Sequence, residues 1–457
     1  NDNYTIEVEK LDNEDVCKID FSKEKGNNTV TVRISDTSKI DSTSKTTTEK
    51  GKVVFYLTEE PDSITGGEYT LTGKKLIVSD VTSNIILNIT MVKSLYDKLL
   101  ADNPTRLERT SYNSLFTTTN VNTLYKTQEN NTDIYYFAGN AQNNWLKFGY
   151  HLDNYSTYIG HFFKDSTVTK SFETLSERES DKSYNNNCTE VVHYKTGDPI
   201  YWRIIRTNSD ESIRLLYHGT SPTSTEAYIN AGLTYNGTKT DPMYVGYKYG
   251  TSGSLESNRT NTNNSVIKET LDTWYANNLK TNYGKYISTT AVYCNDRELE
   301  SGSSYGVYQS FSFKGRERLY TNKTPSYNCT NQSDKFTVDT SIGNGKLVYP
   351  IALMTADEVS FAGSVYMKTV NSGWYHYNSE NQSSTSNKSW WTMTPFNNWS
   401  DSSPLVFTVL GSLYPGGIQA GNIDNTFTVR PVISLKGNNK WKSGEGTASN
   451  PYEIVTE

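Results

Sequence analysis

Residues 389–435 decide the fold of the C-terminal part of this chain: they begin with the run SWWTMTP (389–395) and end with TVRPVISL (428–435). Both runs mix Trp, Val and Ile with Thr, a composition typical of core strands. The middle of the segment, 396–424, is instead polar and aromatic. We therefore predict a firm frame of strands that holds a recognition surface, because Tyr, Trp, Asn and Ser supply contacts at low entropic cost. A merely solvated hairpin rim is the alternative.

Outward from this frame, residues 105–457 predict one α+β domain with few helices. A β-hairpin is expected at 201–206 and 213–217, and a helix at 265–279, where Ile267, Leu271 and Trp274 lie on one face. An apolar strand at 347–354 is expected to run into the capping box TADE at 355–358, which opens a short helix. The segment 149–199 is rich in Tyr, Ser and Asn, and we interpret it as an insertion.

The N-terminal residues 1–90 predict short strands separated by turn signals. This spacing favours an immunoglobulin-like β-sandwich. Residues 91–104 then carry helical periodicity that stops at Asn103-Pro104, so we expect a linker helix there. The expected strands cover 5–9, 16–21, 29–34, 53–57, 69–71, 76–78 and 85–91.

Composition excludes several classes of function. The 457 residues carry 44 Lys plus Arg against 50 Asp plus Glu, a net charge of −6, which gives no general attraction to nucleic acid. No apolar run approaches the roughly 20 residues of a membrane-spanning helix, so we expect no direct membrane insertion of the mature chain. The chain begins at Asn1, and we expect that an N-terminal targeting segment was removed.

The four cysteines form no CxxC pair, which leaves a zinc or thioredoxin-like site without support. They allow two disulfides whose pairing is open from the spacing alone. Structural bridges favour a protein exported to the cell surface over a cytosolic protein with inert thiols.

No catalytic motif emerges from the rest of the chain. The five histidines have no metal-ligand spacing, and neither a nucleophile elbow nor a phosphate-binding loop is present. We therefore predict no metal and no cofactor. A carbohydrate-active enzyme would need two carboxylates facing a cleft. The sequence offers Asp296, Glu298, Asp357 and Glu358 but gives no reason to pair any two of them.

Several motifs resemble a family of secreted proteins from gut Bacillota over about residues 92–457. They are WWTMTP (390–395), VRPVISLK (429–436), YWRIIR (201–206), YCNDR (293–297) and YPIALMTADEV (349–359). The N-terminal strands resemble the immunoglobulin-like repeats found ahead of such domains. Those repeats commonly carry a second cysteine near Leu87, which is missing here, so Cys17 has no obvious local partner.

The C-terminal part also resembles C-type-lectin-like domains, including the variable proteins of diversity-generating retroelements. That resemblance implies calcium-independent binding by displayed side chains, with Trp390, Trp391 and Arg430 as scaffold. It also implies a disulfide between Cys294 and Cys329. The residues that it implies as displayed are Phe396, Asn397, Asn398, Trp399, Ser400, Ser402, Ser403, Leu413, Tyr414, Ile418, Gln419 and Asn422.

Our first prediction is a non-enzymatic surface protein that binds an unknown protein or glycan through 396–424. The alternative is a structural subunit of a surface filament or pilus-like fibre, self-assembling through edge strands of the N-terminal sandwich and displaying the same head. A carbohydrate-active enzyme is the third reading.

Overall fold

The computed structural model describes residues 4–7, 17–23, 29–36, 51–57, 61, 63–81, 85–90, 93–184, 186–237, 240–300, 304–370, 372–377, 388–400 and 403–456. The chain divides into two units, Asn1–Ser94 and Leu95–Glu457. The first unit is built from strands, and the second is an α+β unit with far more strand than helix.

Two four-stranded antiparallel sheets make the N-terminal unit. Buried side chains come from both: Leu57, Leu76 and Val78 from one sheet and Leu87 and Ile89 from the other. Their alternation along each strand explains why these short segments pair with one face inward. In sheet order the strands are β1 (Tyr4–Glu7), β4 (Gly51–Leu57), β7 (Lys75–Val81) and β6 (Thr70–Thr72), then β2 (Cys17–Lys23), β3 (Thr29–Asp36), β8 (Ile85–Thr90) and β5 (Ser63–Thr65).

Each of the seven predicted N-terminal strands overlaps one in the structure, and β5 is an addition. The order of the strands differs from the A-B-E-D and C-F-G sheets of an immunoglobulin constant domain. Here β1 pairs with β4, and β2 and β3 form a hairpin within one sheet. What the structure establishes is therefore a two-sheet β unit.

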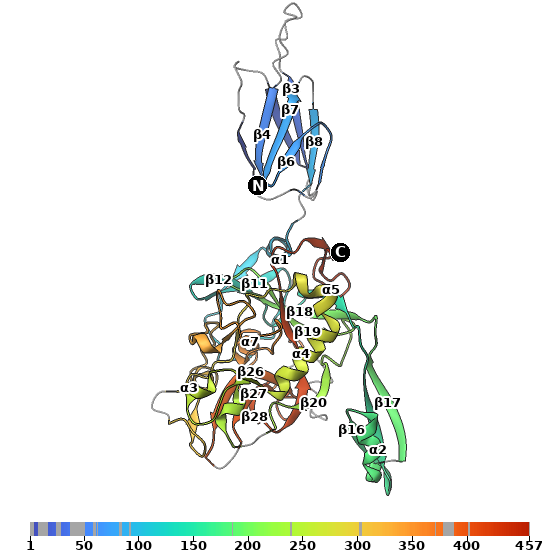
Figure 1. The fold of residues 1–457 in the computed structure, drawn as a ribbon, viewed down its shortest axis with the longest axis vertical. Coiled ribbons are helices and arrows are strands. Elements are labelled where there is room, and N and C mark those ends of the chain that lie inside the picture. Colours follow the sequence, from blue (N-terminus) through green and yellow to red (C-terminus); the bar gives the residue numbers. More distant parts are fainter. Residues whose placement is uncertain are drawn as a thin grey trace, which may run out of the picture. The chain divides into compact units, whose positions relative to one another are not determined.

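The second unit is organised around two large sheets (Figure 1). The first contains the predicted hairpin, β18 (Pro199–Thr207) and β19 (Ile213–Gly219), whose antiparallel pairing is confirmed. Ile204, Leu215 and Leu216 from this hairpin are fully buried and anchor the sheet in the core. Its other strands are β30 (Val432–Leu435), β12 (Thr132–Tyr136), β11 (Thr123–Glu129), β9 (Thr105–Leu107) and β14 (Trp145–Tyr150).

The second sheet contains the frame predicted from 389–435. Its strands are β20 (Asn230–Thr234), β29 (Thr426–Val429), β26 (Trp390–Asn398), β27 (Leu405–Val409) and β28 (Ile418–Asn422), with β24 (Phe311–Ser312) beside β26. The predicted strand at 428–435 is split: β29 belongs to this sheet, and β30 to the first. Pro431 lies at the break, since its missing N–H prevents a continuous ladder.

A three-stranded antiparallel arm extends from the second unit (Figure 1). It consists of β16 (Asp165–Phe172), β15 (Tyr155–Phe162) and β17 (Asn186–Tyr194), with helix α2 (Leu175–Ser180) after β16. The arm occupies most of the segment 149–199 that the sequence marks as an insertion. Cys188 on β17 carries an exposed free thiol, and the side chain of Cys17 lies outside the described part.

Three helices correspond to predicted ones. Helix α1 (Leu95–Asp102) falls in the region 91–104, and its Leu95 and Leu99 are buried in the second unit's own core. Helix α4 (Val266–Asn278) is capped by Ser265 and buries Ile267, Leu271 and Trp274, as predicted. Helix α7 (Ala356–Phe361) has the predicted capping box between Thr355 and Glu358.

The apolar strand predicted at 347–354 does not form. This segment makes a single bridge, between Ala352 and Val432, although Ile351 to Met354 are buried. Pro350 removes a ladder donor in its middle, and burial alone does not require a strand.

The remaining elements are short. They are α3 (Leu255–Asn258), α5 (Lys280–Tyr283), α6 (Lys314–Arg316), β10 (Thr119–Asn120), β13 (Asn140–Ala141), β21 (Lys248–Tyr249), β22 (Asn263–Asn264), β23 (Tyr293–Cys294), β25 (Lys335–Phe336), β31 (Trp441–Ser443) and β32 (Glu453–Ile454). Single 3₁₀ turns occur at Lys182–Tyr184, Pro242–Val245, Gly284–Tyr286 and Gln332–Asp334, and a π-helical turn at Glu317–Asn322.

Candidate functional site

The predicted frame is anchored deep in the core. Trp390 and Trp391, side by side on β26, are fully buried, and the indole of Trp391 donates to the carbonyl of Leu233 at 2.7 Å. Arg430 is buried as well and donates to the carbonyls of Tyr217 and His376 at 3.2 and 3.3 Å. Burial lowers the pKa of Arg430 to about 9. Arg430 thus links Tyr217 of the first sheet to the ring of Trp390 in the second, over which its guanidinium lies at 4.9 Å.

The predicted display residues divide by exposure. Trp399 is 49% exposed and Leu413 is 79% exposed, and Ser400 is also exposed. Tyr414, Gln419 and Asn422 are half-buried, and Ser402 lies outside the described residues. For the other five the prediction of display is wrong, because they are buried: Phe396, Asn397, Asn398, Ser403 and Ile418.

The correction has a simple cause: β26 continues through 396–398 instead of ending at Pro395. Strand β24 pairs with its last residues, placing Phe311 opposite Asn398 and Ser312 opposite Asn397. The amide of Asn398 donates to the carbonyl of Gln309 at 2.6 Å. Sequence reasoning missed this because β24 lies more than 70 positions away and is only two residues long.

The accessible residues lie at two opposite ends of the β26–β27–β28 meander. Leu405 pairs with Asn397 and with Asn422, which places Trp399 and Asn422 near one end. Val409 pairs with Trp390 and with Ile418, so the turn that carries Leu413 lies at the other end. Five residues of β27 separate the ends, roughly 15 Å at the usual strand rise. The accessible residues therefore form two separate groups, one at each end of the strand frame, instead of the single surface that the sequence predicts. We call these two groups the tips.

Leu413 combines two unfavourable features. Its φ is 61°, in the left-handed region that costs a non-glycine residue roughly 1–2 kcal/mol. Its large apolar side chain also stands almost fully in solvent. Such strain clusters at functional positions, and an observed outlier supports a hypothesis of function.

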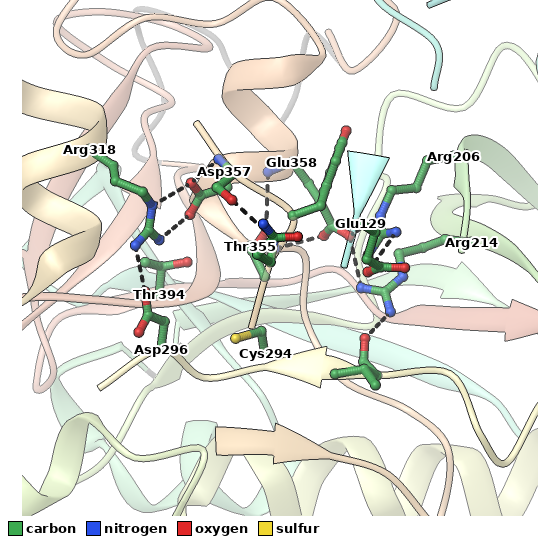
Figure 2. A pocket seen from close by; sticks show the side chains of 14 residues that line it. Glu129, Arg206, Arg214, Cys294, Asp296, Arg318, Thr355, Asp357, Glu358 and Thr394 are labelled. Carbon is green, nitrogen blue, oxygen red and sulfur yellow. Dashed lines mark hydrogen bonds and ion pairs between the residues drawn. The ribbon is translucent and has the colours of Figure 1, made fainter. Parts of the chain in front are cut away.

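A second polar centre lies inside the unit, around a cavity of about 20 Å³ (Figure 2). On one side Glu358 accepts from Arg206 at 3.0 Å and from Arg214 at 2.8 Å. Arg206 also pairs with Glu129 at 3.1 Å. The same Glu358 closes the capping box of α7 by accepting from the backbone N–H of Thr355 at 2.9 Å.

On the other side of this cavity Arg318 joins two aspartates (Figure 2). It donates to both oxygens of Asp357, at 3.1 and 2.9 Å, and to Asp296 at 2.7 Å. Cys294 lines the same cavity and is bonded to Cys329, which confirms the predicted disulfide. Three arginines and four carboxylates thus meet around a space that suits a water molecule.

The two sides differ electrostatically. Burial acts to raise the pKa of Glu358, but Arg214, Arg206 and the Thr355 N–H outweigh it and hold the pKa below its usual value. Burial dominates at Asp296 and raises its pKa despite Arg318. The opposite charges stabilise one another, and the pairs that Glu358 makes with Arg206 and Arg214 connect α7 to the hairpin β18–β19.

The four carboxylates weighed for sugar hydrolysis are engaged by cations. Asp296 and Asp357 bind Arg318, Glu358 binds Arg206 and Arg214, and Glu298 pairs with Lys314 at 2.6 Å. A glycosidic bond would have to lie between two carboxylates. The cavity that Asp296, Asp357 and Glu358 line is of water size, which does not admit a sugar ring.

The sequence did not predict that the arginines of this network meet. The one visible signal was the capping box at 355–358, which turns Glu358 back toward the backbone. Nothing in the spacing of Arg206, Arg214 and Arg318 brings them to the same place, because a sheet and a distant turn position them.

Over the described residues, no group of three or more His, Cys, Asp and Glu side chains is arranged to hold a metal ion. Within the same part of the chain, no helix combines the length and apolar character that crossing a membrane requires.

No protein-family model matches this chain, and no curated protein or solved structure matches it either. Functional conclusions therefore depend on the geometry above.

Proposed function

We propose that this chain is a non-enzymatic extracellular surface protein that binds a protein or glycan through the accessible residues of 396–424. These are Trp399, Ser400 and Asn422 at one tip and Leu413, Tyr414 and Gln419 at the other. The support is a buried frame that carries the exposed side chains of Trp399 and Leu413 and half-buried amide side chains beside them.

Leu413 is the observation on which this proposal chiefly depends. A leucine in a solvated turn gains nothing from burial, and at φ 61° it also carries a backbone cost. A glycine or asparagine would suit the turn better if shape alone mattered. A role in contacting a partner accounts for both costs.

An extracellular location is supported by the disulfide between Cys294 and Cys329, since such bonds persist in oxidising compartments. We also propose a specific fold class for each of the two units. The proposed classes are an N-terminal unit of the broad immunoglobulin-like sandwich class, with a strand order that differs from the constant domain, and a C-type-lectin-like second unit that resembles the variable proteins of diversity-generating retroelements.

The test uses the full chain, fluorescently labelled, on a glycan array and on intact bacterial and epithelial cells. Trp399→Ala and Leu413→Ala are compared with Val348→Ala, which removes a similarly exposed apolar side chain outside both tips. We expect each tip variant to weaken binding about tenfold or more while its thermal unfolding is unchanged. Binding that survives both tip substitutions, or that falls equally with Val348→Ala, would refute the site.

A filament subunit is the second candidate, and the arm favours it. Seven of the eight residues of the edge strand β16 are exposed. The strands β1, β6, β2 and β5 are likewise sheet edges in the N-terminal unit. Edge strands can add a strand from a second copy. Light scattering of the purified chain decides: a monodisperse monomer at high concentration argues against self-assembly, whereas growing oligomers support it.

A further inference from the structure

A groove of about 360 Å³ runs between helix α4 and the base of the arm. None of the residues that line it belongs to the segment 396–424. Its volume falls in the range of small-molecule sites. From the arm side it is lined by Asp153, Tyr155 and Tyr194. From α4 it is lined by Glu269, Trp274 and Asn277 together with two threonines.

The two carboxylates lie toward opposite ends of the groove. Asp153 is beside Asn277, whose amide donates to its Oδ2 at 3.3 Å. Glu269 is eight positions before Asn277 on α4, about 12 Å along the helix axis. No Lys or Arg lines the space, so its described lining is acidic at both ends.

Asp153 has an unmet hydrogen-bonding capacity. Its Oδ1 is buried and has no partner in the structure. A buried carboxylate oxygen without a donor is costly, and a cationic donor satisfies it best. Glu269 is exposed and makes no ion pair with a described residue, which leaves its carboxylate accessible from the groove.

Between the two acids the groove is lined by aromatic side chains and by two threonines. Tyr194 and Trp274 are buried, so each exposes only a small part of its ring. Tyr155 is held in place because its hydroxyl donates to Glu173 at 2.9 Å and accepts from the Ala231 N–H at 2.7 Å. Buried rings give little stacking area for a sugar but an apolar wall for methylene groups.

The hydroxyls of the two threonines are already donors to the helix backbone. Thr270 donates to the carbonyl of Val266 at 3.0 Å and Thr273 to that of Glu269 at 2.9 Å. They therefore offer acceptor lone pairs to the groove. Together with the two carboxylates, the threonines give the lining four acceptor groups for the N–H groups of a ligand, beside the N–H donors of Asn154, Asn277 and Trp274.

We propose that this groove binds a linear organic polycation, with one ammonium group at Asp153, another at Glu269 and the methylene chain along Tyr155, Tyr194 and Trp274. The ligand class is a polyamine such as spermidine, or two lysine side chains of a peptide that present the same groups. This site is separate from the tips of the proposed function and does not depend on them.

The test is isothermal titration calorimetry of the full chain with spermidine at low ionic strength. We expect Asp153→Asn and Glu269→Gln each to weaken binding about tenfold, the loss expected for one charge-assisted contact. The matched control is Glu256→Gln, which removes an exposed carboxylate on α3 outside the groove. Butylamine and ethylenediamine should bind more weakly than spermidine, because neither spans both acids.

Three results would overturn the proposal: no spermidine or oligolysine binding, equal loss with Glu256→Gln, or equal affinity for ethylenediamine. Oligolysine that binds through Asp153 and Glu269 where spermidine does not would assign the ammonium groups to a peptide and overturn the free polyamine. Trp399→Ala should leave the titration unchanged, so this experiment and the tip experiment fail independently.

Discussion

At the scale of single residues, Glu358 carries more of the architecture than any residue of the predicted site. Its carboxylate joins two strand arginines and caps α7 at once. A buried charge that loses its partner is expensive, since the remaining charges stay desolvated.

We expect Glu358→Gln to lower the free energy of unfolding of the second unit by about 3–5 kcal/mol. Glutamine preserves the cap geometry, so the loss reports the charge. Tryptophan fluorescence in a urea titration measures it, because all eight tryptophans lie in this unit. Glu256→Gln should change the value by less than about 0.5 kcal/mol, and an equally mild effect of Glu358→Gln would contradict the network's importance.

Replacing Leu413 should have the opposite effect on stability. Leu413→Gly removes the left-handed strain. Because the leucine side chain is already exposed, its removal loses no buried apolar area, and the free energy of unfolding should rise by up to about 1 kcal/mol. The same titration measures it. A clear loss of stability would show that the side chain packs in the fold and would weaken the case for a contact role.

At the scale of elements, sequence reasoning succeeded where the signal is local. The helix at 266–278 and the cap at Thr355 follow from periodicity and from one capping box. The hairpin β18–β19 follows from alternation around a polar turn. These features depend on neighbours within a few residues.

Predictions failed where distant segments decide the outcome. Residues 396–398 read as a polar loop but form a strand end because β24 covers them. The run 428–435 reads as one strand but changes sheets at Pro431. For the site, composition located the frame, whereas only the register of β27 shows that the tips are apart.

The disulfide ties β23 to the segment before β25. It closes a loop of 35 residues, so replacing Cys294 and Cys329 by Ser should cost about 3–4 kcal/mol in the chain-entropy model. Urea titration of the double variant measures the loss. Peptide mapping of the unreduced protein should recover the two cysteines as one linked fragment, and finding both as free thiols would contradict the bond.

At the scale of the whole molecule, buried histidines contribute to the response to acid, and the lowered pKa of Glu358 acts in the same direction. Burial lowers the pKa of His151 to about 4, and it lowers the pKa of His218 and His376 as well. A histidine in the unfolded chain titrates near 6.5. As the pH falls below 6.5 the unfolded state takes up protons that the folded state refuses, so folding stability falls.

Three such histidines predict a loss of up to about 4 kcal/mol per pH unit between roughly pH 6 and pH 4. The raised pKa of Asp296 works in the opposite direction at the lower end of this window. Urea titrations at several pH values give the slope, and His151→Gln should reduce it by about a third. An unchanged slope in that variant would contradict the assignment.

On the proposed function, the accessible positions of 396–424, and not the buried ones, face a ligand. The ligand is unidentified, but natural sequence variation can show which positions face it even when its identity is not known. We would therefore sequence the coding locus from many cells of one community. We predict substitutions concentrated at 399, 400, 413, 414, 419 and 422, with 389–395, 396–398, 403, 418 and 428–435 constant. Uniform codons throughout, or variation that falls as often on the buried positions, would contradict it.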